Sequence, residues 1–303
     1  MTKLPVMATV SLAYGFLLGE IGTILRLVWA PLLVGALLSY LFGGPVDPST
    51  APKDAAAALQ QQGPQFLIGM VSFVTGIMAT VALLRVVVFG DRQPGLYVYL
   101  WLGGAELRLI AVTFLLIIAF IAAIIGASLL FAVVAVIVAA VPVLSIVLLA
   151  AMGALIFVSV WVPVRLSLVS AVVVAESNLG VERSWALSKG NAWRLFLVIL
   201  SIYLPYLIAM WIAITVVLGA DFPAFPAFPS IAPDAAKSEA AMKVAAEAFQ
   251  TSWVEWEVAF LAALRAHWTG VAVLGFIGNV VTTALWTGAM GTAYRMLAGD
   301  RHA

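Results

Sequence analysis

The sequence predicts an all-α polytopic membrane bundle with about six transmembrane helices, an N-terminal interfacial helix and an exported amphipathic helix. Of the 303 residues, 64% are hydrophobic and only 10% are charged, and the mean hydropathy is +1.14. A soluble domain is usually about a quarter charged, so this chain has too little polar surface to cover a water-soluble globule. Several apolar stretches also reach the ~20 residues that cross a bilayer. We therefore expect one membrane domain over residues 1–303.

Each predicted span follows from an apolar run of the required length. The run from Leu109 to Val164 carries no charge and is too long for one crossing at about 1.5 Å per residue, so we expect a hairpin with its turn near 138–143. The six expected spans are 23–43, 66–90, 109–135, 142–164, 192–220 and 268–297. Five or seven spans are the alternatives if the hairpin or the N-terminal stretch is misread.

The distribution of Lys and Arg predicts the orientation, because cytoplasmic loops carry an excess of them. The side holding the N-terminus has eleven: Lys3, Arg26, Arg85, Arg92, Arg108, Arg165, Arg183, Lys189, Arg194, Arg295 and Arg301. The other side has four: Lys53, Lys237, Lys243 and Arg265. We therefore expect both termini in the cytoplasm, with cytoplasmic segments 91–108 and 165–191 and exported loops 44–65 and 221–267. The N-terminal stretch lacks a small-residue cleavage pattern, so we expect it to be retained.

Two stretches are expected to lie on the membrane instead of across it. Residues 6–24 have apolar residues at helical spacing, and Gly15 and Gly19 form a small-xxx-small pair. This stretch either lies flat on the membrane or forms part of the first span. Residues 221–234 repeat Phe-Pro-Ala, which in polyproline II places Phe222, Phe225 and Phe228 on one side. Residues 235–266 then read as a long amphipathic helix with the apolar face Met242, Phe249, Trp253, Trp256, Phe260 and Leu264.

Enzymatic chemistry has little support in the sequence. Cysteine is absent, and the two histidines, His267 and His302, have no further ligands at a spacing typical of a metal site. No nucleophile elbow or phosphate-binding glycine motif is present. We expect no catalytic residue, no cofactor and no metal, and the net charge of +1 gives no reason to expect nucleic-acid binding.

Charged residues, together with one tryptophan, gather near the predicted cytoplasmic ends of the helices, and we call this set the charged belt. Its members are Arg26, Arg85, Glu106, Arg108, Arg165, Glu176, Arg183, Trp185 and Arg194. One interpretation is that these side chains anchor helix ends at the interface. The other is a ring in which Arg165 meets Glu176 and Glu106 meets a neighbouring arginine. Such a ring would lock the helices together or hold lipid phosphates.

Asn279 is the candidate polar residue at the membrane midplane, with apolar sequence on either side. It would either line the cleft of a carrier or make an interhelical hydrogen bond.

The polar passage 175–196 is expected to turn the chain at the membrane surface. Asn178 and Gly180 break the helix, a short helix follows, Gly190 stops it, and Asn191 can cap the next span.

The stretch 165–196 also carries a specific pattern, spread over Glu176, Arg183, Ser184, Trp185, Leu187, Ser188, Gly190, Arg194 and Leu195. It resembles the cytoplasmic signature of the YciC-like bacterial membrane proteins, which are grouped with the membrane domain fused to some glycerophosphodiester phosphodiesterases. The segments 79–94, 105–110 and 293–297 look similar more loosely. The resemblance implies a membrane domain of about six spans and no hydrolase activity, since in the fusions the hydrolase is a separate soluble barrel.

We therefore expect a non-enzymatic integral protein of the bacterial inner membrane, acting as an accessory or scaffold subunit or as a lipid-interacting envelope protein. Its expected partners are membrane lipids and either a larger membrane protein complex or further copies of itself. The alternatives are a small-molecule or lipid carrier with a cleft near Asn279 and, third, a membrane-embedded hydrolase.

Overall fold

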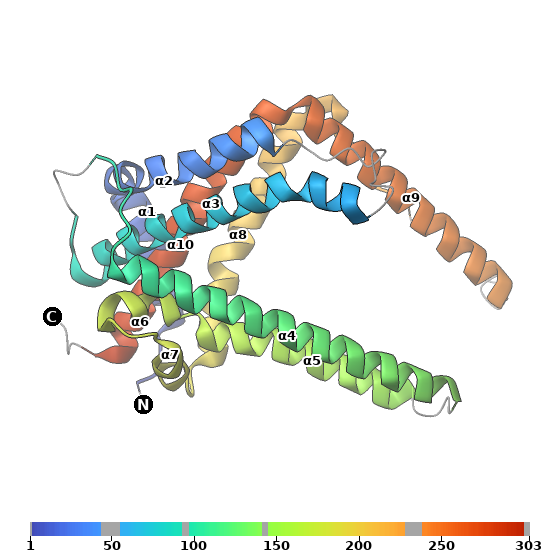
Figure 1. Ribbon diagram of the computed structural model, residues 1–303, viewed down its shortest axis with the longest axis horizontal. Coiled ribbons are helices and arrows are strands. Elements are labelled where there is room, and N and C mark those ends of the chain that lie inside the picture. The colour runs from blue at the N-terminus through green and yellow to red at the C-terminus, as the bar shows by residue number, and fades with distance from the viewer. Residues whose placement is uncertain (1, 44–54, 93–96, 141–144, 228–237, 300–303) are drawn as a thin grey trace. The chain divides into compact units, whose positions relative to one another are not determined.

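The computed structural model describes residues 2–43, 55–92, 97–140, 145–227 and 238–299, and every regular element in these ranges is helical (Figure 1). This confirms the expected all-α polytopic bundle. The helices are α1 (Val6–Gly19), α2 (Ile21–Phe42), α3 (Ala55–Phe89), α4 (Gly104–Ala140), α5 (Ser145–Leu166), α6 (Val169–Glu176), α7 (Val181–Leu187), α8 (Ala192–Leu218), the short 3₁₀ helix η3 (Gly219–Asp221), α9 (Glu239–Ala266) and α10 (Trp268–Ala298).

Six stretches are long and apolar enough to cross a membrane: 21–42, 63–89, 104–134, 149–176, 192–221 and 268–298. They match the six expected spans within a few residues at most ends. The fourth span differs most, since it begins at 149 instead of 142 and ends at 176 instead of 164. The third span begins earlier than expected, because α4 starts at Gly104 instead of 109. Glu106, in the first turn, accepts a hydrogen bond from the Gly103 backbone N–H at 3.0 Å and so satisfies a free donor at the helix start.

The chain divides into two compact units, and the boundaries fall inside α2, α3, α8 and α10. Unit 1 comprises 1–33, 73–206 and 279–303, and unit 2 comprises 34–72 and 207–278. Unit 1 contains all eleven Lys and Arg residues that the charge bias assigned to the cytoplasm, with six acids, giving a formal charge of +5. Unit 2 contains the other four with eight acids, giving −4. The division of the chain into two compact units thus separates the Lys and Arg residues into the same two groups as the predicted membrane orientation.

Helix α6 forms part of the core of unit 1. Val169 and the four residues from Ala171 to Val174 are all buried, so this short helix is covered on nearly every side. The apolar sequence beyond Arg165, at the beginning of the expected cytoplasmic segment 165–191, is therefore a buried core element. A helix that is apolar all round is typically buried in this way.

Helices α4 and α5 run side by side as the expected hairpin (Figure 1). Of the expected turn, 138–140 belong to α4 and 141–143 lie outside the described residues. The apolar span in α4 is only 11% buried by the chain itself. Such a surface suits lipid or another membrane protein and does not suit water.

Unit 2 contains the expected amphipathic helix, α9. It begins at Glu239 because the Ser238 hydroxyl caps it by accepting from the Ala241 N–H at 3.4 Å. The rings of Phe222 and Phe225 pack on α9: Phe225 stacks on Trp256 with 5.2 Å between centroids. These two phenylalanines therefore cover the helix, whereas we expected a free stripe for the membrane interface. Phe228 and 235–237 lie outside the described residues. Of the expected first exported loop, 44–54 also lie outside the described residues, and the remainder belongs to α3, which begins at Ala55.

Candidate functional site

Arg165 of the charged belt fastens α7 to the end of α5. Its Nη2 donates to the Trp185 carbonyl oxygen at 2.7 Å, its Nε donates to the Ser188 hydroxyl at 3.2 Å, and its guanidinium lies 4.0 Å from the Trp185 ring centroid. In return, the Ser184 hydroxyl donates to the Arg165 carbonyl oxygen at 2.9 Å. The donors of this arginine are therefore directed toward the protein.

Glu176 joins three helices. Its Oε1 accepts from Arg183 Nε and from the Tyr294 hydroxyl, each at 3.0 Å, which links α6 to α7 and α10. The expected Arg165–Glu176 pair is thus replaced by Arg183–Glu176. The reason is a reversal of the chain after α6, where Ser177 and Gly180 both have positive φ (56° and 73°) and bring Arg183 back beside Glu176.

Glu106 is fully buried at the start of α4. Its Oε1 accepts from the Tyr99 hydroxyl at 2.6 Å, and Arg85 Nη2 lies 3.8 Å from the same oxygen. The structure thus places Glu106 near an arginine, as expected, although the short hydrogen bond comes from a tyrosine. Burial, and then the bond to Glu106, raise the pKa of Tyr99. This tyrosine therefore stays protonated and serves as a donor.

The N-terminal residues are tied to the beginning of α8. The Leu4 N–H donates to Asn191 Oδ1 at 2.9 Å, Asn191 Nδ2 donates to the Thr2 carbonyl at 3.0 Å, and Arg194 Nη1 donates to the Leu4 carbonyl at 2.8 Å. Asn191 was expected to cap α8, but its side chain instead satisfies the backbone of a segment 187 residues away.

Helix α1 lies across the ends of other helices. Its N-terminal end is held at the start of α8, and the residue after it, Glu20, is bonded to Arg92, which follows α3. Its 14 residues give a length of about 21 Å, less than the ~30 Å hydrocarbon core. The chain breaks at Glu20 before α2 begins, so α1 is a separate helix and not the start of the first span.

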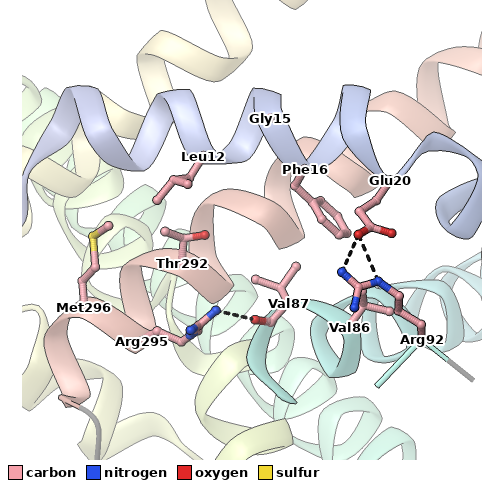
Figure 2. A pocket seen from close by; sticks show the side chains of 10 residues that line it. All are labelled: Leu12, Gly15, Phe16, Glu20, Val86, Val87, Arg92, Thr292, Arg295 and Met296. Carbon is pink, nitrogen blue, oxygen red and sulfur yellow. Dashed lines mark hydrogen bonds and ion pairs between the residues drawn. The ribbon is translucent and has the colours of Figure 1, made fainter. Parts of the chain in front are cut away.

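A groove of about 540 Å³ runs beneath α1, and we call it the α1 groove (Figure 2). It is lined by Leu12, Gly15, Phe16, Glu20, Val86, Val87, Arg92, Thr292, Arg295 and Met296. Its volume is in the range of ordinary small-ligand sites. All of its walls belong to unit 1.

Two glycines of α10 lie against residues that line the α1 groove. A Cβ at Gly288 would lie 3.1 Å from Phe16 Cδ1, and a Cβ at Gly291 would lie 2.6 Å from Val87 Cγ1. Glycine at these positions therefore lets α1 and α3 approach α10 closely. Gly15, in contrast, has nothing within 4 Å of a built Cβ, so α1 leaves open space there.

The α1 groove carries two guanidinium groups and one carboxylate on otherwise apolar walls. Glu20 Oε1 accepts from Arg92 Nε at 3.0 Å and from Arg92 Nη2 at 2.6 Å, and these bonds meet at one end of the groove in Figure 2. The bond from Arg92, followed by one from Thr23, lowers the pKa of the Glu20 carboxyl. Arg295 Nη1 donates to the Val87 carbonyl at 3.3 Å. The groove thus combines an apolar interior with cationic groups.

None of the charged-belt residues lines the α1 groove, although Arg26 supports it by donating from Nη2 to the Arg92 carbonyl at 2.6 Å. Arg108 is half-buried in the first turns of α4. Sequence reasoning did not select Glu20, Arg92 or Arg295 as site residues. The one available signal was Glu20 itself, a lone acid between two apolar helical stretches.

Neither Asn279 nor His267 lines the α1 groove. Asn279 is exposed, and its Oδ1 accepts from the Thr283 hydroxyl at 3.4 Å within α10. His267 Nε2 lies 2.8 Å from Asp221 Oδ2, and His302 is outside the described residues. In the part of the chain that the structure describes, no group of three or more potential metal ligands comes together.

No protein-family model, no curated protein and no solved structure matches the chain. Its function is therefore inferred from the charged belt and the α1 groove.

Proposed function

We propose that this chain is a non-enzymatic, multi-pass protein of the bacterial inner membrane that binds a membrane lipid in the α1 groove. The observation that carries the proposal is the composition of that groove. Leu12, Phe16 and Met296 offer apolar walls, while Arg92 and Arg295 offer positive charge. This combination is complementary to an amphiphile with an acyl chain and an anionic head.

The hydrogen bonds of the charged belt support different roles for the belt and for the α1 groove. Arg165, Arg183 and Arg194 each donate to groups of the protein itself, so these residues hold the helix ends together. The two arginines of the α1 groove have fewer of their N–H donors bonded to the described residues of the protein. Lipid binding is therefore assigned to the groove, and the belt is assigned a structural role.

The orientation is also part of the proposal. All eleven basic residues at the expected cytoplasmic helix ends and termini belong to unit 1, and this excess of positive charge favours the cytoplasmic side for both termini. The signature in 165–196 supports membership of the YciC-like proteins.

A test of lipid binding is mass spectrometry of lipids retained through purification in mild detergent. Gly15→Trp should fill the open space in the groove, whereas Gly19→Trp places the same side chain one helical turn further on, also in open space and outside the lining. We expect a lipid bound at one per chain in the wild type and in Gly19→Trp, and its loss in Gly15→Trp. Equal retention by the two variants would refute the groove as the binding site.

An accessory role in a larger complex is the second candidate, favoured by the exposed apolar surface of α4 and α5. The same purification tests it, because a stoichiometric protein partner that survives Gly15→Trp would identify an accessory subunit. A carrier with a cleft near Asn279 would lose function in Asn279→Leu. We expect that variant to retain lipid as the wild type does.

A further inference from the structure

We propose that the ligand of the α1 groove is an anionic phospholipid and that Glu20 competes with its phosphate for Arg92. The inference rests on the proposed lipid binding and adds the chemical class of the headgroup. It also gives the Glu20–Arg92 ion pair a specific role, namely to occupy the phosphate site while the groove holds no lipid.

The geometry of Arg92 provides the phosphate site. Both of its bonds to Glu20, from Nε and Nη2, go to the single oxygen Oε1. Among the described residues, its Nη1 has no hydrogen-bond partner, and the side chain is 58% exposed. A guanidinium binds a phosphate through two parallel N–H···O bonds, so a phosphate can engage Nη1 and then take Nη2 from the carboxylate.

The two partners of the ion pair are held differently. Arg92 is positioned through its backbone, because Arg26 donates to its carbonyl oxygen at 2.6 Å. Glu20 has a second partner of its own, since its Oε2 accepts from the Thr23 hydroxyl at 2.9 Å. Glu20 therefore keeps one hydrogen bond when it releases Arg92, which makes the exchange less costly than exposing an unpaired carboxylate.

A second positive charge favours an anionic ligand. Arg295 uses Nη1 on the Val87 carbonyl, and its Nε and Nη2 have no partner among the described residues. The lining thus has two positive charges against one negative charge, and an anionic phospholipid brings one net negative charge. The apolar walls formed by Leu12 and Phe16 favour a lipid over a soluble phosphate, because a soluble phosphate would gain nothing from them.

The test is reconstitution of the delipidated, full-length protein into nanodiscs of pure phosphatidylcholine or of phosphatidylcholine with 30% phosphatidylglycerol. The protein is then extracted in mild detergent, and the retained lipid is identified by mass spectrometry. We expect the wild type to enrich phosphatidylglycerol. Arg92→Gln should reduce that enrichment about fivefold, as expected for one basic residue at an anionic surface. Glu20→Gln should increase it several-fold, because the competing carboxylate is gone.

Matched controls change the same charges elsewhere in unit 1. Lys189→Gln removes one positive charge and Glu182→Gln removes one negative charge from exposed positions outside the α1 groove, and neither should alter the enrichment. Soluble glycerol phosphate should compete only weakly. Effective competition by it would identify a free phosphate ester as the ligand and overturn the lipid assignment.

The remaining outcomes are equally decisive. A loss of lipid in Glu20→Gln would mean that the carboxylate binds a cationic headgroup, which would overturn the proposal in favour of a zwitterionic lipid. If Gly15→Trp releases lipid but Arg92→Gln and Glu20→Gln leave the headgroup preference unchanged, the anionic class is wrong and lipid binding stands. If retention does not depend on Gly15, lipid binding in the groove is refuted as well.

Discussion

The Arg165 guanidinium stacks 4.0 Å from the ring centroid of Trp185 and also donates a 2.7 Å hydrogen bond to the carbonyl oxygen of that same residue. One side chain therefore binds Trp185 through its ring and its backbone together. This double contact fixes α7 against the end of α5, and it requires a planar cation with several donors.

Replacing Arg165 by lysine should therefore destabilise the protein although the charge is kept. Lysine cannot stack and donate in the same way, and we expect a loss of about 1–3 kcal/mol in the free energy of unfolding. Thermal unfolding in detergent measures it. Lys189→Arg, at an exposed position on the same side of unit 1, should unfold as the wild type does. Identical melting of Arg165→Lys and the wild type would show that the double contact contributes nothing.

Tyr294→Phe should cost about 1 kcal/mol, because it removes the 3.0 Å bond from the tyrosine hydroxyl to Glu176 Oε1. Tyr203→Phe is the matched control in unit 1, since among the described residues the Tyr203 hydroxyl has no hydrogen-bond partner and its ring packs on Trp286. Parallel urea unfolding of the two variants checks the difference. A control that loses as much stability as Tyr294→Phe would contradict a specific role for this bond.

Gly291→Ala should destabilise the contact between α3 and α10. The added Cβ would lie 2.6 Å from Val87 Cγ1, so the Val87 side chain or one of the two helices must shift, and overpacking of this kind costs about 1–3 kcal/mol. Gly275→Ala, in the same helix but with nothing within 4 Å of its Cβ, should be neutral or slightly stabilising. The melting temperatures of the two variants report the outcome, and equal values would exclude close packing at Gly291.

The Glu20–Arg92 pair should make a pH-dependent contribution to stability. The pKa of Glu20 is lowered from 4.5 in the folded protein, so the contribution is fully present above pH 4.5 and is lost as the pH falls through the lowered value. Wild type and Glu20→Gln should therefore differ in melting temperature at pH 7, and the difference should disappear as the pH falls below the lowered pKa of Glu20. The difference should be small and should shrink in high salt, because the pair is exposed to solvent. A difference that grows on acidification would have the wrong sign for this mechanism.

The spans could be predicted from the sequence because each depends on a local property, namely an apolar run long enough to cross a bilayer. The α4–α5 hairpin shows this well, since the absence of charge from Leu109 to Val164 was sufficient to predict it. Helix α6 shows the limit of the same signal. Its apolar residues fit a membrane interface and a protein core equally, and only the packing of the other helices places Val172 in the core.

The candidate site could be predicted only in part, because it is assembled from residues distant in sequence. Glu20 and Arg92 are 72 positions apart, and Tyr294 and Glu176 are 118 apart. Basic residues near helix ends could be identified as a set, but their partners depend on which helices are neighbours. A lone acid such as Glu20 gives no indication of its arginine until α1 is seen to lie across the end of α3.

The most direct test of lipid binding in the α1 groove uses the absence of cysteine from the chain. A single cysteine in place of Leu12 lines the groove, and one in place of Leu18 lies on the same helix outside the lining. The measurement is the rate of maleimide modification of each variant in detergent, before and after phosphatidylglycerol is added. We predict that the lipid slows modification at position 12 and leaves position 18 unchanged. Equal rates at position 12 with and without lipid would contradict a lipid-binding groove beneath α1.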